Sequence, residues 1–157
     1  MLATESTMTV AYATAILALF MWLCGTITTY VRGRSMESPN HEDAMVMNFF
    51  NRVFFVPVRK LSVLPDNSEK DALTNRWIRI TNNNTANIPA ALLVFFLAAQ
   101  FASLDAAILV PLIWVFVAAR FAHTLFYAMA VQPLRTATYS VSATCMMIAA
   151  ISILISN

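Results

Sequence analysis

Residues 106–131 read AAILVPLIWVFVAARFAHTLFYAMAV, an almost unbroken apolar run in which Arg120 is the only residue with a full charge at neutral pH. A stretch of about 17–25 such residues is long enough to cross a bilayer as a helix. Segments of similar composition occur before and after it. The predicted helices cover residues 9–31, 72–101, 106–131 and 134–155, with a connection at 32–71. The predicted fold is therefore all-α, a single integral-membrane domain built as a bundle of four transmembrane helices.

The overall composition supports a membrane protein. Hydrophobic residues make up 59% of the chain, charged residues 11%, and the mean hydropathy is +0.67. A soluble domain rarely has such a composition. Because the cations lie within or beside the apolar segments, the net charge of +2 predicts contact with the membrane surface and no nucleic-acid partner.

The positions of the cations predict the orientation of the chain. All ten lie in or beside the first and third connections: Arg32, Arg34, Arg52, Arg59, Lys60, Lys70, Arg76, Arg79, Arg120 and Arg135. The connection near residues 103–105 has none. Short loops rich in Lys and Arg face the cytosol, so we expect a multi-pass protein with both termini on the far side. We also expect the first helix to be retained, because its apolar run exceeds that of a signal peptide.

The two cysteines and one aromatic-rich segment are predicted to have structural roles. Cys24 and Cys145 lie inside apolar segments, where they read as small apolar fillers and not as reactive thiols. The aromatic-rich segment 45–64 is predicted to lie at the membrane interface without spanning. The sequence points to no metal site.

Polar residues recur on single faces of three predicted helices. On the second helix, Arg76, Arg79, Asn83 and Asn87 follow the spacing i, i+3, i+7 and i+11, which keeps them on one side at 100° per residue. On the third helix, Arg120, His123 and Tyr127 share a face in the same way. The fourth opens with residues 132–136, QPLRT, and presents Tyr139 one turn after Arg135, with proline suited to the first turn.

These polar residues can be structural or functional. An ionisable side chain inside a membrane costs about 2.5–3.5 kcal/mol on insertion scales. In a structural reading, Arg76 and Arg79 extend to the headgroups while His123 and Tyr127 hydrogen-bond between helices. All three polar faces lie toward the cytosolic half, however, so we expect them to surround a polar ligand.

Four motifs resemble the membrane-associated proteins in eicosanoid and glutathione metabolism, the MAPEG family. Val31–Arg34 followed by Asn40–Ala44 is similar to the family's VRxR and NPEDA segments, with His at the position of Pro. Arg76–Asn83 is similar to RxxRAxxN. Arg120–Tyr127 matches RxAHTxxY, and Pro133–Tyr139 matches PxRSxxY, most closely as found in microsomal glutathione transferases and prostaglandin E synthases.

The resemblance implies an activity and roles for individual residues. It implies a homotrimer that binds glutathione on its cytosolic side, between protomers. Arg135 would activate the thiol, with Thr136 as a hydroxyl donor. The glutathione-binding residues would be Arg32, Arg76, Arg79, Asn83, His123, Tyr127 and Tyr139. In one departure, Ala86 stands where the family has Glu, with Asn87 as the nearest polar residue.

Several functions remain open at this point. The leading hypothesis is a glutathione transferase or peroxidase acting on a lipophilic electrophile or lipid hydroperoxide that enters from the bilayer. A glutathione-dependent prostaglandin-type isomerase is an alternative within the same family. The loss of the family's Glu at Ala86 also fits a non-catalytic lipid-binding scaffold. A membrane protein with a purely structural role is the last alternative. It does not explain why Arg120 and His123 are placed inside the membrane at a cost in free energy.

Overall fold

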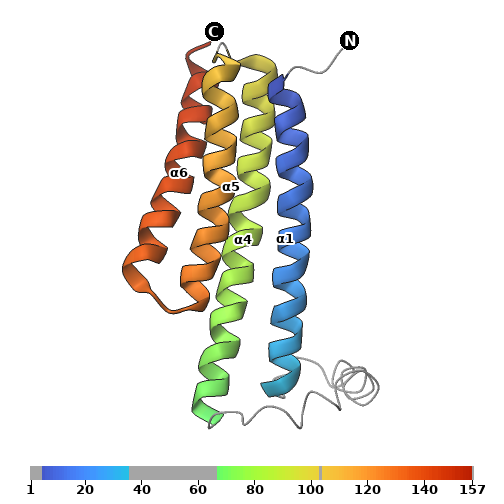
Figure 1. The fold of residues 1–157 in the computed structure, drawn as a ribbon, viewed down its shortest axis with the longest axis vertical. Helices are drawn as coiled ribbons and strands as arrows, with labels where there is room; N and C mark the ends of the chain where they lie inside the picture. Colours follow the sequence, from blue (N-terminus) through green and yellow to red (C-terminus); the bar gives the residue numbers. More distant parts are fainter. Residues whose placement is uncertain (1–4, 36–66, 103, 157) are drawn as a thin grey trace.

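The computed structural model describes residues 5–35, 67–102 and 104–156. These residues form α1 (Glu5–Ser35), α4 (Asn67–Phe101), α5 (Ala106–Ala128) and α6 (Gln132–Leu154), shown in Figure 1. Each helix is long and apolar enough to cross a membrane. Within the described residues, the prediction of an all-α fold with four helices long and apolar enough to span a membrane is confirmed. The predicted interfacial segment 45–64 lies outside the described residues.

The observed helix boundaries differ from the predicted ones mainly at polar ends. Helix α1 covers 5–35 instead of 9–31, and α4 begins at Asn67 instead of residue 72. Length and apolarity locate the part of a helix that crosses the bilayer, whereas backbone hydrogen bonds continue into water. At the other end of the chain, α5 stops at Ala128 instead of residue 131, and α6 begins at Gln132 instead of 134.

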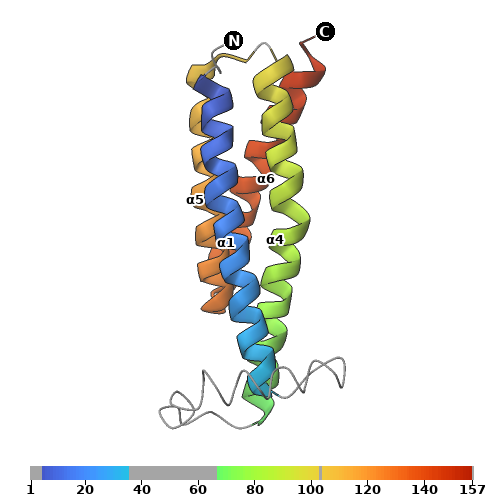
Figure 2. The ribbon, with the colours of Figure 1, turned by 90° about the vertical axis from the view of Figure 1, so that its right-hand side faces the viewer.

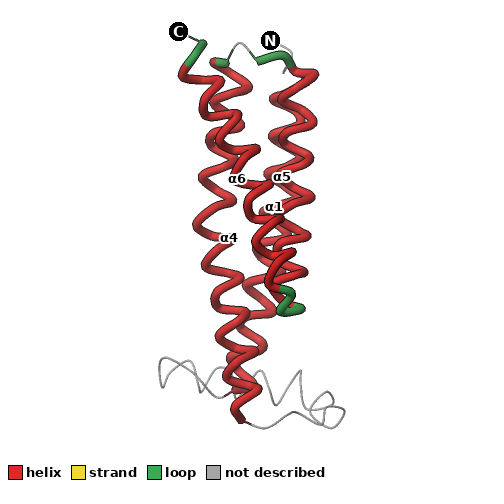
Figure 3. Tube along the Cα trace, turned by 90° about the vertical axis from the view of Figure 1, so that its left-hand side faces the viewer, coloured by secondary structure: helices red, strands yellow, loops and turns green. Residues whose placement is uncertain are grey.

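The four helices run side by side along the long axis of the bundle, as the views from its two opposite sides show (Figures 2 and 3). The most extensive packing is between α5 and α6 and between α1 and α4. Helix α1 begins, and α6 ends, at the end of the bundle where α4 leads into α5 (Figure 1). The α5–α6 connection lies toward the opposite end, where α1 ends and α4 begins. The cation-rich ends of the described helices therefore lie on one side.

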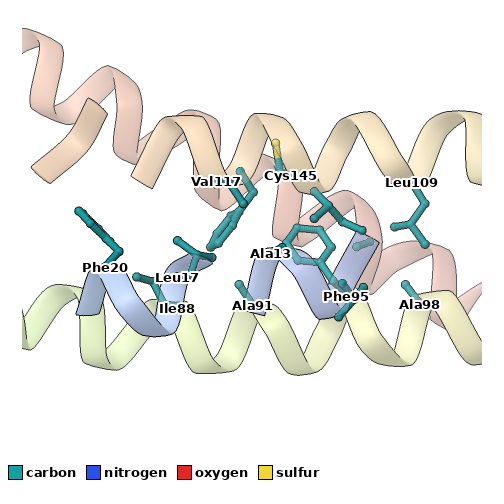
Figure 4. Close-up of a cluster of buried hydrophobic side chains, with 14 of the residues drawn as sticks. Ala13, Leu17, Phe20, Ile88, Ala91, Phe95, Ala98, Leu109, Val117 and Cys145 are labelled. Carbon is teal, nitrogen blue, oxygen red and sulfur yellow. The ribbon is translucent and has the colours of Figure 1, made fainter. Parts of the chain in front are cut away.

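The core is formed by apolar side chains from all four helices. Leu17 of α1, Phe95 of α4 and Ile113 of α5 are fully buried, and Cys145 of α6 is nearly so. The rings of Phe95 and Phe116 meet edge to face, with centroids 5.3 Å apart. Figure 4 shows side chains of α1, α4 and α5 meeting between the helices. Packing of this kind, and not the hydrophobic effect, holds helices together in lipid.

The connection between α5 and α6 is a tight turn with an unusual residue. Ala130 adopts a left-handed conformation with φ of 60°. The turn is closed by hydrogen bonds from the amide of Ala130 to the carbonyl of Tyr127 and from the amide of Val131 to the carbonyl of Phe126. This is the pattern that ends many helices, usually with glycine in the left-handed position. The turn brings the start of α6 against the end of α5.

Candidate functional site

A buried arginine is held by two asparagines in the bundle interior. Arg120 of α5 is completely buried. Its Nη2 atom donates to Oδ1 of Asn83 and to Oδ1 of Asn84, both at 2.6 Å. We call these three residues the arginine clamp. A hydrogen bond to a charged group contributes about 1.5–3 kcal/mol, so two such bonds offset an insertion cost of about 2.5–3.5 kcal/mol for the arginine.

The clamp satisfies one end of the guanidinium. Nε and Nη1 of Arg120 are buried and have no hydrogen-bond partner among the residues that the structure describes. The partners that it does have are neutral amides, so the charge is solvated without being neutralised. The cluster is therefore a local positive centre at the interface of α4 and α5.

The second asparagine of the clamp was not predicted from the sequence. The Nδ2 atom of Asn84 donates to Oγ1 of Thr124 at 3.1 Å and makes a longer contact of 3.8 Å with Sγ of Cys24. This side chain therefore joins α1, α4 and α5. It escaped prediction because it lies one residue, or about 100°, away from the stripe that includes Asn83. Thr124 follows Arg120 at i+4, a signal that does indicate a shared face.

Arg135 brings the polar residues of α5 and α6 together. Its guanidinium lies over the Tyr127 ring, with 4.4 Å between the guanidinium carbon and the ring centroid. His123 lies beside both tyrosines, with ring centroids 5.8 Å from Tyr127 and 5.8 Å from Tyr139. We call His123, Tyr127, Arg135 and Tyr139 the aromatic cluster. The contact between Arg135 and Tyr127 is a cation–π interaction, worth about 0.5–1 kcal/mol at an exposed site and more when desolvated.

A hydrogen bond fixes His123 within this cluster. Its Nδ1 atom lies 2.9 Å from the carbonyl oxygen of Arg135. Because a carbonyl only accepts, Nδ1 carries the proton. In the neutral ring the lone pair is then on Nε2, which is buried and has no partner within the described part of the chain. His123 and Arg120 lie three residues apart on α5, so the aromatic cluster adjoins the arginine clamp.

The first turn of α6 presents a positive helix end near Arg135. Gln132 and Pro133 open the helix, and the N-cap residue Val131 makes no side-chain capping bond. The earliest regular bond of the helix runs from the amide of Arg135 to the carbonyl of Val131. An uncapped helix start favours anions, since its N–H groups and macrodipole are positive. Thr136 is exposed, and its hydroxyl donates to the carbonyl of Gln132 at 3.3 Å.

Arg76 links the start of α4 to the end of α5. Its Nη1 atom donates to the carbonyl oxygen of Ala128 at 3.0 Å. A cation at a helix C-terminus interacts favourably with the macrodipole. Arg76 therefore supports the turn that leads into α6, in addition to any role in binding.

The remaining predicted residues lie on α1 and α4 and are not members of these two clusters. Arg79 is exposed on α4, while Arg32 near the end of α1 is half-buried. Asn87 is half-buried, and its Nδ2 donates to the backbone carbonyl of Asn83 at 2.7 Å. Ala86, at the position of the family's Glu, is exposed. The described residues thus bring His123, Tyr127, Arg135 and Tyr139 together, with Asn83 nearby, and leave Arg79 on the outside.

Comparison with known proteins places the chain in a family. No curated protein matches the chain. The family model described as the MAPEG family matches residues 9–155, which is nearly the whole sequence. That family includes glutathione transferases and related enzymes, and some of its members are non-catalytic. The four membrane helices agree with this match, and the chain belongs to the MAPEG family.

Proposed function

We propose that the protein is a membrane-bound glutathione transferase or peroxidase that activates the glutathione thiol at Arg135. The observation that carries this proposal is the position of Arg135, which lies in the uncapped first turn of α6 and stacks on Tyr127. A cation and a positive helix end at one place favour a bound anion. The anion in this reading is the glutathione thiolate.

Ionisation of the glutathione thiol requires this electrostatic stabilisation. A free thiol has a pKa of about 8.5 and is only slightly ionised at neutral pH, while the thiolate is the nucleophile. A nearby arginine and a helix N-terminus lower the pKa of a bound thiol. The thiolate then attacks a lipophilic electrophile that enters from the bilayer, and the carbon–sulfur bond forms as the leaving group departs as an anion. In the peroxidase reaction it attacks the terminal oxygen of a lipid hydroperoxide, the O–O bond breaks to release the lipid alcohol, and a second glutathione converts the resulting sulfenic acid to the disulfide and water. Arg135 is favoured over Thr136 as activator, because the hydroxyl proton of Thr136 is used within its own helix.

The remainder of the peptide needs other partners. Glutathione carries two carboxylates, which arginine binds well through its planar fork. Arg76 and Arg79 on α4, with Arg32 on α1, supply cations near the end of the bundle that holds Arg135. The side-chain amide nitrogen of Asn83 and the rings of His123, Tyr127 and Tyr139 complete the proposed pocket, which opens toward the cytosol.

A homotrimer is the proposed assembly, and the outer face of α4 supports it. Asn75, Arg79 and Asn82 are exposed in a single chain. At 100° per residue they lie within about 60° of one another. All three fall inside the candidate membrane span Ala72–Phe101. Polar side chains in a membrane are costly when they face lipid, so contact with another copy, or with glutathione held between copies, is the favourable arrangement.

The proposal is tested by separating binding from turnover. Wild type, Arg135→Ala and Thr136→Val are purified in detergent, and glutathione affinity is measured by calorimetry. Turnover of an aromatic halide is followed across pH. Removing Arg135 is expected to change affinity only a few-fold and to lower the rate about a hundredfold or more, the scale for loss of a transition-state charge partner. Full activity in Arg135→Ala contradicts its role, and absence of glutathione binding by wild type contradicts the function.

A lipid-binding scaffold is the second candidate, and one observation favours it. The family's Glu is replaced by the exposed Ala86. The amide nitrogen of the neighbouring Asn87 is bonded to its own helix. The ammonium group of glutathione would therefore be bound more weakly. Glutathione binding without turnover of any electrophile or hydroperoxide would support this scaffold over the enzyme.

A further inference from the structure

The side chain of Gln132 contacts the guanidinium of Arg135. The Nη2 atom of Arg135 donates to Oε1 of Gln132 at 2.9 Å. Arginine only donates, so the amide oxygen of the glutamine must face it. The two residues are three positions apart in the first turn of α6, which places them on one side of the helix. On its face, the same guanidinium contacts the Tyr127 ring of α5.

We infer that Gln132 is a positioning residue for Arg135 and that its neutrality preserves the activating charge. This inference rests on the proposed function. Arginine has several rotatable bonds, and an exposed arginine samples many rotamers at an entropic cost to any ordered contact. The glutamine oxygen and the tyrosine ring restrict the guanidinium from two directions. The Arg135 guanidinium is thereby fixed in position at the start of α6 before glutathione binds.

The identity of the residue at position 132 matters because a carboxylate would fit the same place. In the variant Gln132→Glu, the new carboxylate would accept the same hydrogen bond from Arg135 but would also supply an opposite charge. The positive field at the bound thiolate would fall, because opposite charges at this distance interact directly. An amide provides the hydrogen bond without this cancellation. The residue at position 132 is thus expected to determine how strongly the Arg135 charge stabilises the bound thiolate.

The test compares three further variants with wild type and Arg135→Ala, all in detergent. Gln132→Met keeps the length of the side chain without the acceptor, and Gln132→Glu adds the charge. Ala137→Glu is the matched control. It places the same charge on an exposed residue of the same helix, two positions and about 200° from Arg135. The measurements are glutathione affinity and the pH dependence of turnover with one aromatic halide.

Each outcome has a defined meaning. The expected result for Gln132→Glu is a shift of the rate profile to higher pH by about one unit, the lower range for a nearby charge. Gln132→Met is expected to lose about two- to tenfold in kcat, the fold-change for one typical hydrogen bond at an exposed site, with KM within twofold. Ala137→Glu is expected to keep the wild-type profile. If Arg135→Ala is inactive but both Gln132 variants match wild type, the positioning role is overturned alone. If wild type neither binds nor turns over glutathione, the proposed function is overturned and this inference with it.

Discussion

The Nδ1 atom of His123 lies 2.9 Å from the carbonyl oxygen of Arg135, so a histidine inside α5 holds the first turn of α6. This hydrogen bond passes between two helices that are joined by a short turn, and it fixes the tautomer of the imidazole. The backbone that carries Arg135 is therefore positioned from a neighbouring helix and not only by its own.

The contribution of this bond is measurable. His123→Phe keeps an aromatic ring against Tyr127 and Tyr139 but removes the donor. The Arg135 carbonyl still accepts from Thr138, so it is not left without a partner. We expect a loss of about 1 kcal/mol in the free energy of unfolding in detergent, typical of one hydrogen bond. Thr144→Ala on the exposed side of α6 serves as control, and equal stability of the two variants would contradict the interpretation.

The arginine clamp predicts an ordered series of stabilities. Asn84→Ala removes an acceptor of Arg120 and the donor to Thr124, and we expect a loss of about 1.5–3 kcal/mol or more. Asn83→Ala should cost less, because Asn83 is only half-buried. Asn84→Asp places a carboxylate against the guanidinium and should preserve or raise stability. Thermal unfolding of the three variants gives the order, and a strongly destabilised Asn84→Asp would indicate that the site does not hold a charged arginine.

The turn between α5 and α6 should tolerate, and benefit from, glycine. Ala130 has φ of 60°, a region where a side chain is disfavoured and glycine is not. Ala130→Gly is expected to raise the free energy of unfolding by about 1 kcal/mol. Part of this gain is offset by the greater freedom of glycine in the unfolded chain. Ala128→Gly, inside the last turn of α5, should destabilise, and a matching loss in both variants would show that the turn is not strained.

Arg79 distinguishes ligand binding from simple contact with headgroups. The residue is exposed in the single chain, so Arg79→Ala should leave the protomer fold intact. If it binds a glutathione carboxylate, affinity should fall by about 1.5–3 kcal/mol, the range for a hydrogen bond between charged groups. Calorimetry on Arg79→Ala and Arg79→Gln decides this. Unchanged affinity in both variants would favour a residue that merely extends to the membrane surface.

The predicted orientation can be read from two reporter cysteines. Phe101 at the end of α4 and Met129 after α5 are 68% and 60% exposed. The native Cys24 and Cys145 are buried and should not react with an impermeant maleimide. With the protein expressed in the plasma membrane of intact cells, Phe101→Cys should be labelled from outside, whereas Met129→Cys should require permeabilisation. Reversed labelling would contradict the prediction from the positive-inside rule.

The helices could be predicted from the sequence because interactions between residues close together in the chain determine them. A run of apolar residues long enough to cross lipid must satisfy its backbone within itself, and a helix does so. The faces of α5 and α6 were also predictable from spacing. Arg120 and His123 are both buried, and His123 meets Arg135 across the α5–α6 turn.

The partners of individual side chains could not be predicted in the same way. The spacing placed Arg76 and Arg79 on one stripe, but Arg76 contacts the end of α5 while Arg79 is exposed. Asn84 lies off that stripe and still reaches Arg120 and Thr124. These outcomes depend on how far one helix is rotated and shifted against the next. Packing across the whole bundle determines that relationship, and periodicity within one helix does not.

The two pairs of helices differ in length, and this difference shapes the end of the bundle near Arg135. Helix α4 has 35 residues and α5 has 23, and at about 1.5 Å per residue α4 is longer by about 18 Å. At the end of the bundle with the α5–α6 connection, α1 and α4 continue further than the other pair (Figure 1). This end of the bundle is therefore uneven, with α1 and α4 extending past α5 and α6. In the proposed function, a charged peptide would approach Arg135 through water and an apolar compound would approach it through the lipid, without either having to leave its own phase.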